Sequence, residues 1–220
     1  DVFVAKYDTG GNVLWAKTAG GTSGYAWGCG IAVDALGNSS YVTGGYYGTA
    51  TFGSVMLSSA GNGDIFVAKY DTGGNVLWAR SAGGTSGNDV GLGIAADAAC
   101  NSYVTGFYEG TATFGSFMLT SAGSSDVFVA KYDTGGNVLW ARSAGGVGQE
   151  RGQGIAVDGV GNSYVTGDHE GTGTFGPFTL ASAGGFDVFV AKYGTGGNVL
   201  WARTDGGPGP LGPDFDAGAG

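Results

Sequence analysis

His169 is the only histidine of the chain, and it lies between two carboxylates, Asp168 and Glu170. An imidazole beside carboxylates can accept and return a proton near neutral pH, so this is the one place where general acid–base chemistry can be argued. The sequence offers no nucleophile motif, no second histidine and no phosphate-cradling loop to accompany it. An enzyme such as a lyase or hydrolase using His169 is therefore one hypothesis, but we expect a protein with no catalytic residues and no cofactor.

Further candidates are aromatic and charged side chains at positions where otherwise repeated segments differ. Such a mixture can stack on sugar rings or contact a partner protein, and surface variation without function is the alternative. A first group is predicted in the loop that precedes an inner strand: Tyr25, Trp27, Asn88, Asp89, Gln149, Glu150 and Arg151. A second group is predicted to follow the next strand: Tyr46, Tyr47, Phe107, Tyr108, Glu109, Asp168, His169 and Glu170.

These positions stand out because the rest of the chain is repeated. The block DVFVAKYDTGGNVLWAK begins at Asp1, and near-copies begin at Asp64, Asp126 and Asp187. A second block, GIAVDALGNSSYVTG, begins at residue 30 and recurs in shorter form from residues 93 and 154. Each repeat therefore holds two related strand pairs, and self-similarity at this period is typical of propellers and related arrays.

Both blocks are predicted to form strand, turn and strand. Residues 2–7 and 13–17 are rich in β-formers and flank an Asp-Thr-Gly-Gly-Asn turn, and residues 31–33 and 41–43 flank a second turn. Apolar residues occupy successive positions in FVAKY and NVLWA, so both faces of these strands are expected to be covered. We therefore predict an all-β fold of four-stranded antiparallel blades of the β-propeller type.

Residues that recur in every repeat are predicted to be structural, because an active site needs a unique constellation. The recurring Asp residues are expected to cap turns, and the mid-strand Lys residues to pair with a neighbouring Asp. The recurring Trp and Phe residues are expected to fill space between blades. Calcium is the alternative for GGTSGNDV at residues 83–90, which loosely resembles nonapeptide calcium repeats but is not tandem, so we predict no metal.

The combination of DVFVAKYD, GNVLWAR, GIAVD and GNSYVTG resembles the bacterial seven-bladed β-propeller repeat family over about residues 1–204. This resemblance implies a propeller fold in secreted or surface-attached bacterial proteins, mostly without an assigned activity. It brings no catalytic residues to this chain. The segment GTATFGS that follows YVTG departs from the usual connection of the family, so loop chemistry cannot be carried over.

The strand count leaves the predicted propeller open. The resemblance implies that GIAVD is the innermost strand and NVLWAR the outermost, so residues 30–80, 93–142 and 154–203 give complete blades, and residues 1–17 give an outer half-blade. Unpaired strand edges invite association. Either the chain is part of a longer propeller, or copies complete one another as an oligomer or filament. Residues 205–220 are expected to form a Gly/Pro-rich tail, and residues 215–218 faintly echo an inner strand.

The composition of the chain argues against some classes of binding partner. Nine basic against 18 acidic residues give a net charge of −9, which repels a nucleic acid backbone. No apolar run is long enough to span a membrane, and the start of the chain has neither an initiator Met nor a signal-peptide pattern, as expected for a processed product or a piece of a longer protein. We expect an extracellular or bacterial cell-surface scaffold that associates with itself, the alternative being a glycan-binding module.

Three local departures from the repeat give further predictions. Cys100 replaces a turn glycine, so that turn must either be strained or relaxed. The extra Ser in NSSYV predicts a strand bulge, and a deletion between residues 146 and 155 predicts a surface loop. Cys29 and Cys100 occupy different points of the repeat and are predicted to be free thiols, which leaves the redox compartment open.

Overall fold

The computed structural model describes residues 1–21 and 24–208. In that part of the chain the regular secondary structure consists of β-strands, with no helix. A half-blade consists of β1 (Val2–Tyr7) and β2 (Val13–Ala19). Blade 1 consists of β3 (Tyr25–Val33), β4 (Ser39–Tyr47), β7 (Asp64–Asp71) and β8 (Val76–Ala82). Blade 2 consists of β9 (Val90–Ala96), β10 (Ser102–Tyr108), β13 (Asp126–Tyr132) and β14 (Val138–Gly146). Blade 3 consists of β15 (Glu150–Val157), β16 (Ser163–Phe175), β17 (Phe178–Tyr193) and β18 (Val199–Asp205).

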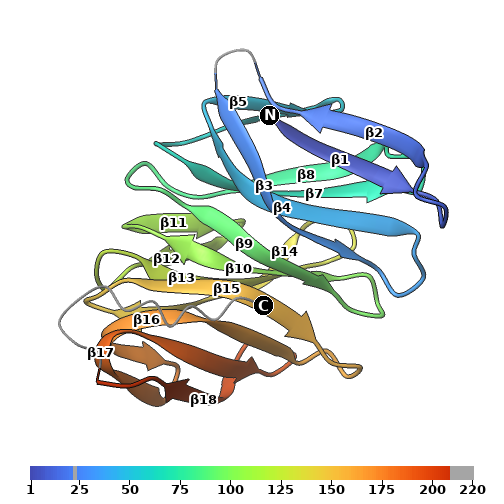
Figure 1. The fold of residues 1–220 in the computed structure, drawn as a ribbon. Helices are drawn as coiled ribbons and strands as arrows, with labels where there is room; N and C mark the ends of the chain where they lie inside the picture. The colour runs from blue at the N-terminus through green and yellow to red at the C-terminus, as the bar shows by residue number, and fades with distance from the viewer. Residues whose placement is uncertain (22–23, 209–220) are drawn as a thin grey trace.

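The blades are antiparallel sheets stacked in chain order, from the half-blade at one end to blade 3 at the other (Figure 1). Blade 1 has the strand order β3-β4-β7-β8, and the corresponding order is found in blades 2 and 3. The predicted arrangement, with GIAVD innermost and NVLWAR outermost, is confirmed. No sheet of the described residues closes into a ring, so the fold is an open set of propeller-like blades. No helix capable of crossing a bilayer is present in residues 1–21 and 24–208.

A short hairpin connects the second and third strands of each complete blade. Its strands are β5 (Thr49–Phe52) and β6 (Val55–Ser58) in blade 1, and β11 (Thr111–Phe114) and β12 (Phe117–Thr120) in blade 2. In blade 3 the same hairpin is continuous with β16 and β17. Each hairpin pairs with the end of the outermost strand of the preceding blade, through Gly20–Thr51, Gly83–Thr113 and Gly145–Thr174. The segment that departs from the resembling family therefore links neighbouring blades.

Three hydrophobic clusters fill the junctions between successive units. Val67 and Trp78 of blade 1 pack with Phe128 and Tyr132 of blade 2, and the other two junctions repeat this arrangement. Phe66, the neighbour of Val67, faces the opposite way and packs in the cluster that blade 1 shares with the half-blade. Blades 1 and 2 are therefore covered on both faces, as the unbroken apolar runs predict. The recurring Trp and Phe residues fill inter-blade space, which confirms their predicted role.

Turn aspartates hold the strand pairs together. The Asp8 carboxylate accepts hydrogen bonds of 2.8–2.9 Å from the backbone N–H groups of Gly10 and Asn12 and from the Asn12 amide. The same bonds recur at Asp71 and Asp133. Because these bonds favour the charged form, they hold the pKa of each of these carboxyls below its ordinary value. The predicted capping role is confirmed.

Cys100 keeps the geometry of the glycine that it replaces. Its φ is +62°, the only positive φ of a non-glycine residue among the described residues, and its N–H still bonds the Asp97 carbonyl at 3.0 Å. The turn is therefore strained rather than relaxed. Both cysteines are free in the structure, Cys29 exposed and Cys100 half-buried.

The two length changes have different outcomes. The predicted strand bulge at the extra Ser is wrong, because the inner turn absorbs the residue. The Asp34 N–H bonds the Ser39 carbonyl, one residue further along than in the Asp97–Asn101 turn, and pairing resumes in register. A turn lengthens more cheaply than a paired strand, whose ladder an extra residue disrupts. The deletion lies in the connection between β14 and β15, as predicted.

Candidate interaction surfaces

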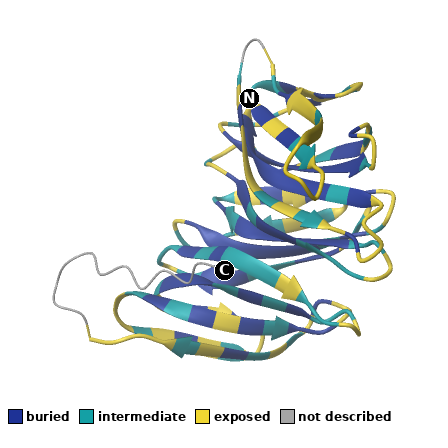
Figure 2. Cartoon of the chain, turned by 45° about the vertical axis from the view of Figure 1, so that its right-hand side comes forward, coloured by how far each residue is buried: buried dark blue, intermediate teal, exposed yellow. Residues whose placement is uncertain are grey.

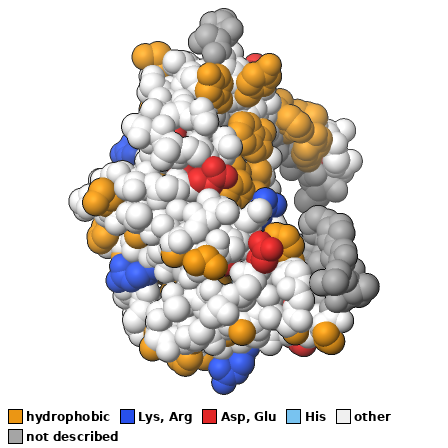
Figure 3. Space-filling model, turned by 90° about the vertical axis from the view of Figure 1, so that its left-hand side faces the viewer, with side chains coloured by type: hydrophobic (Ala, Val, Ile, Leu, Met, Phe, Trp, Pro, Cys, Tyr) orange, Lys and Arg blue, Asp and Glu red, His pale blue; other side chains and the backbone are white. Residues whose placement is uncertain are grey.

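Tyr25, Trp27 and Tyr47 form an exposed aromatic patch at one end of blade 1. The predicted loop positions of these residues are wrong, because β3 begins at Tyr25 and β4 continues to Tyr47, and these two residues pair across the strands. Their exposed fractions are 76%, 40% and 48%, respectively. Trp27 lies over Gly45, where an added Cβ would come within 2.3 Å of the indole ring. Figure 3 shows hydrophobic side chains exposed over the upper part of the molecule, at the level of β1–β5 in Figure 1.

Tyr46, Tyr108 and His169 occupy the same position of successive repeats and are fully buried. The prediction that these residues belong to surface loops is wrong, because the second strand of each blade extends through them and their side chains turn toward the neighbouring unit. Tyr46 bonds the Ser81 hydroxyl and Tyr108 bonds the Ser143 hydroxyl, both at 2.6 Å. These tyrosines therefore serve blade packing and are inaccessible to a sugar ring.

His169 replaces this tyrosine in blade 3. Its Nε2 lies 2.7 Å from Thr204 Oγ1, and its ring packs against Phe175 and Phe189. Burial lowers the pKa of the imidazole, and Nδ1 has no hydrogen-bond partner among the described residues. The neighbouring Asp168 accepts a hydrogen bond from Gln153 at 2.9 Å. The site that suggested acid–base chemistry is thus a buried packing position.

Phe107, Glu109 and Glu170 are less buried than the neighbouring Tyr108 and His169. Phe107 is half-buried beneath the Arg151 guanidinium, which lies 5.3 Å from the centre of its ring. Glu109 accepts a hydrogen bond from the Asn88 N–H at 3.1 Å, and Glu170 is half-buried. Because successive side chains of a strand alternate between faces, each buried Tyr or His is followed by a more accessible residue. The structure therefore divides the predicted group between two faces.

Two buried carboxyl pairs lie at the junctions that join blades 1, 2 and 3. Asp89 is fully buried, and a Cβ added at Gly83 would touch both its carboxylate and that of Asp64. Glu150 and Asp126 have the same relation around Gly145. Burial raises the pKa of Asp89 and that of Glu150 to about 7. The described residues contain no group of three or more metal-ligating side chains, and both oxygens of Asp89 accept backbone N–H groups.

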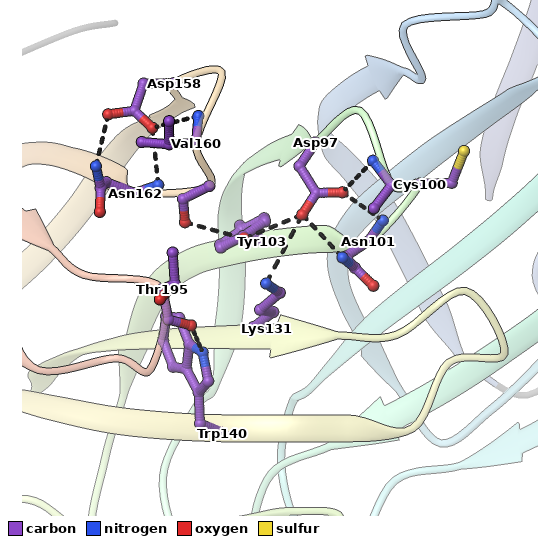
Figure 4. A network of polar contacts seen from close by, with 12 residues as sticks. Asp97, Cys100, Asn101, Tyr103, Lys131, Trp140, Asp158, Val160, Asn162 and Thr195 are labelled. Atoms are coloured by element: carbon purple, nitrogen blue, oxygen red, sulfur yellow. Dashed lines mark hydrogen bonds and ion pairs between the residues drawn. The ribbon is translucent and has the colours of Figure 1, made fainter.

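Polar contacts also pass from each blade to the next. Figure 4 shows Trp140 of blade 2 donating its indole N–H to the Thr195 carbonyl of blade 3 at 3.0 Å. Tyr103 donates to the Gly161 carbonyl of blade 3 at 3.2 Å and to Asp97 of its own blade at 3.1 Å. The predicted Lys–Asp pairing is confirmed at Lys131–Asp97 and Lys192–Asp158, both 3.7 Å.

The innermost strands surround a hollow of about 620 Å³ that the sequence did not reveal. Cys29, Leu92 and Gln153 line it, and each is skipped by the strand pairing at the same point of its blade. Each of these bulged residues has a glycine on either side. At Gly30 and Gly93 an added Cβ would lie 3.0–3.1 Å from a carbonyl oxygen of the neighbouring blade. A varying residue between invariant glycines is the sequence signal for this position.

A second, smaller hollow of about 230 Å³ lies beside the half-blade. Val4, Tyr7, Ile31 and Val33 contribute to its walls. In the complete blades, the second strand covers the edge that β1 leaves open in the described residues. The unpaired edge predicted from the strand count is therefore present, with apolar side chains around it.

Comparisons with known proteins agree with this architecture. The model of the SBBP family, a beta-propeller repeat, matches residues 140–168. An uncharacterized WD repeat-containing protein of Acanthamoeba polyphaga mimivirus, L264, is 27% identical over 264 residues, covering 92% of this chain and 19% of the viral protein. The regulatory protein FlaEY of Caulobacter vibrioides is 29% identical over 141 residues, covering 63% of this chain and 15% of that protein.

The chain thus spans less than a fifth of the length of these two relatives. A crystal structure of a protein of unknown function from Bacteroides caccae aligns with 92% of this chain and 93% of its own, with a TM-score of 0.29 and 11% identity. Together with the four-stranded sheets, the family match and the WD-repeat relative indicate that this chain is built of β-propeller-type repeats.

Proposed function

We propose that this protein is an extracellular or cell-surface scaffold that works through protein contacts and associates with itself through its open blade edges. The exposure of Phe3 carries the proposal. Phe3 is 74% exposed, whereas its equivalents Phe66, Phe128 and Phe189 are fully buried under the hairpin of their own blade. Figure 2 shows exposed residues along the strands next to the N-terminus. An exposed ring beside an unpaired strand edge favours association.

The incomplete half-blade also supports association. In the described residues the half-blade has only the outer strand pair of the repeat that the resembling bacterial family implies, so its inner edge is open to another copy. A location outside the cell rests on that same resemblance, which includes secreted and surface-attached proteins. An acidic net charge of −9 accords with a partner other than nucleic acid.

Sedimentation velocity of the purified chain over a wide concentration range tests this proposal. We expect a mass above that of the monomer, rising with concentration. The variant Phe3→Lys is expected to weaken association, because the charge would have to be buried without a partner. A stable monomer at every concentration would refute self-association.

Glycan binding is a second candidate, favoured by the exposed Tyr25, Trp27 and Tyr47 patch. Aromatic rings with one free face can stack on the apolar face of a sugar. A glycan array is expected to give hits that the triple variant Tyr25→Ala, Trp27→Ala and Tyr47→Ala abolishes. The matched control Leu77→Ala, an exposed apolar residue outside the patch, is expected to retain the hits. An array without hits for the unaltered chain would remove this candidate.

A further inference from the structure

The junctions inside the chain are built around one recurring contact. The indole N–H of Trp15 donates to the Thr72 carbonyl, that of Trp78 to Thr134 and that of Trp140 to Thr195, at 2.9–3.0 Å. Each acceptor lies in the Asp-Thr-Gly-Gly-Asn turn, or its Gly-Thr-Gly-Gly-Asn counterpart, of the following blade. The outermost strand of one unit therefore always docks on the outer turn of the next.

Glycine in this turn makes room for the ring. At Gly74, Gly136 and Gly197 an added Cβ would lie 2.7–2.8 Å from the indole of the preceding unit. Arg80 and Arg142 add a second bond, from Nη2 to the carbonyls of Gly135 and Gly196. In blades 2 and 3 the outer turn therefore receives two side chains of the preceding unit. A tryptophan lies over the turn glycine, and an arginine bonds the carbonyl of the residue before that glycine.

Among the described residues, the half-blade and blade 3 each carry one half of this contact without its counterpart. At one end, the indole N–H of Trp201 has no acceptor among residues 1–21 and 24–208, and Arg203 bonds only the carbonyl of its neighbour Ala202. Val190 beside them is 37% exposed, whereas its equivalents Val67 and Val129 are buried. The face of blade 3 that carries Trp201 therefore has the same kinds of side chain as the faces through which blades 1 and 2 contact the next blade.

At the other end, the outer turn of the half-blade has the conformation of the occupied turns, but no tryptophan ring of the described residues lies on it. The turn from Asp8 to Asn12 has the same hydrogen bonds as the occupied turns, and Gly11 has φ +82°, like +78° at Gly74 and +81° at Gly136. An added Cβ at Gly11 would meet nothing within 4 Å. No residue in the described part of the chain provides the ring that fills this space in the other blades.

We infer that a second copy of this chain occupies the open face of blade 3, with Trp201 seated on Gly11 and donating to the Thr9 carbonyl of that copy. This inference rests on the proposed self-association and names its surface. Arg203 would bond the Gly10 carbonyl, as Arg142 bonds Gly196. The exposed Phe3, on the receiving side of the half-blade, would be covered by the same contact. A head-to-tail junction of this kind would repeat the contacts of the junctions inside the chain, so the two surfaces that meet are complementary for the same reason.

Two variants test this, one at each end. Trp201→Ala removes the ring, and Gly11→Asn adds a side chain in the ring's place while tolerating a positive φ. Each is expected to weaken association at least about tenfold, since a buried tryptophan commonly dominates an interface. Leu200→Ala, on the face of β18 opposite to Trp201, and Gly171→Asn, at a positive-φ glycine with nothing within 4 Å, are matched controls expected to associate normally.

Mixing the two variants gives the sharpest test. The Gly11→Asn copy still has Trp201, and the Trp201→Ala copy still has Gly11, so an equimolar mixture should form a one-to-one dimer by sedimentation. Failure of the mixture to associate would overturn the head-to-tail contact, as would unimpaired association of both single variants. In that second case the unaltered chain would still self-associate through another surface. A monomeric unaltered chain would instead refute the proposed function itself.

Discussion

Replacement of Phe128 by alanine is expected to lower the free energy of unfolding by about 3–5 kcal/mol, the usual cost of deleting a fully buried aromatic ring. Phe128 packs against Phe114 with ring centres 4.8 Å apart and lies in the cluster between blades 1 and 2. Removing it leaves a cavity that the two sheets cannot close, because strand pairing fixes each of them. Urea or thermal unfolding at low protein concentration measures the loss.

Phe3→Ala is the matched control for this prediction. Phe3 occupies the same repeat position but is 74% exposed, so its removal should change the stability of the monomer by less than about 0.5 kcal/mol. The same substitution in the same local sequence thus separates packing from intrinsic strand preference. Equal losses at the two positions would contradict the blade packing described above.

The stability of the protein is expected to fall as the pH rises from about 4 to 7. Burial raises the pKa of Asp89 from 3.8 and that of Glu150 from 4.5 to about 7 in the folded state. Across that interval the folded chain holds protons that the unfolded chain has released, so ionisation favours unfolding. Each carboxyl contributes about 2–4 kcal/mol to the change, which is complete above pH 7. Melting temperatures across this range should therefore fall by roughly 10 °C or more.

Neighbouring carboxylates strengthen this effect, and one group opposes it. Asp64 and Glu109 repel a charge on Asp89, and Asp126 repels one on Glu150. The lowered pKa of buried His169 has the opposite sign, because the unfolded chain binds that proton first as the pH falls below 6.5.

The double variant Asp89→Asn, Glu150→Gln is expected to flatten the decline in melting temperature. Asp71→Asn serves as the control, since Asp71 is exposed and its pKa is lowered by its bonds to Asn75. The stabilisation from Asp71 is present above about pH 4 and is lost only in acid, so its removal should leave the slope between pH 5 and 8 unchanged. A slope equally steep in the double variant would show that other groups carry it.

The order of strands in a blade was predicted from the family resemblance, and the repeat, the strand pairs and their turns were predicted from the residues alone. These features are local, since each hairpin lies within about 20 residues and its turn chemistry reads directly from Asp, Gly and Asn. Lysine pairing and the role of the tryptophans were predicted on the same basis, whereas the sequence left open whether the turn at Cys100 is strained or relaxed. The open strand count also followed, because it depends only on how many copies are present.

Which of the variable residues are accessible depends on the tertiary structure and could not be predicted from the sequence. Strands extended beyond their predicted ends, so Tyr46 and Tyr47 alternate between core and solvent, and His169 takes a buried tyrosine position. Nor does the local sequence separate Phe3 from Phe128, whose flanking residues are the same. Their environments differ because burial depends on whether inner strands and a hairpin cover the ring, and those lie far along the chain.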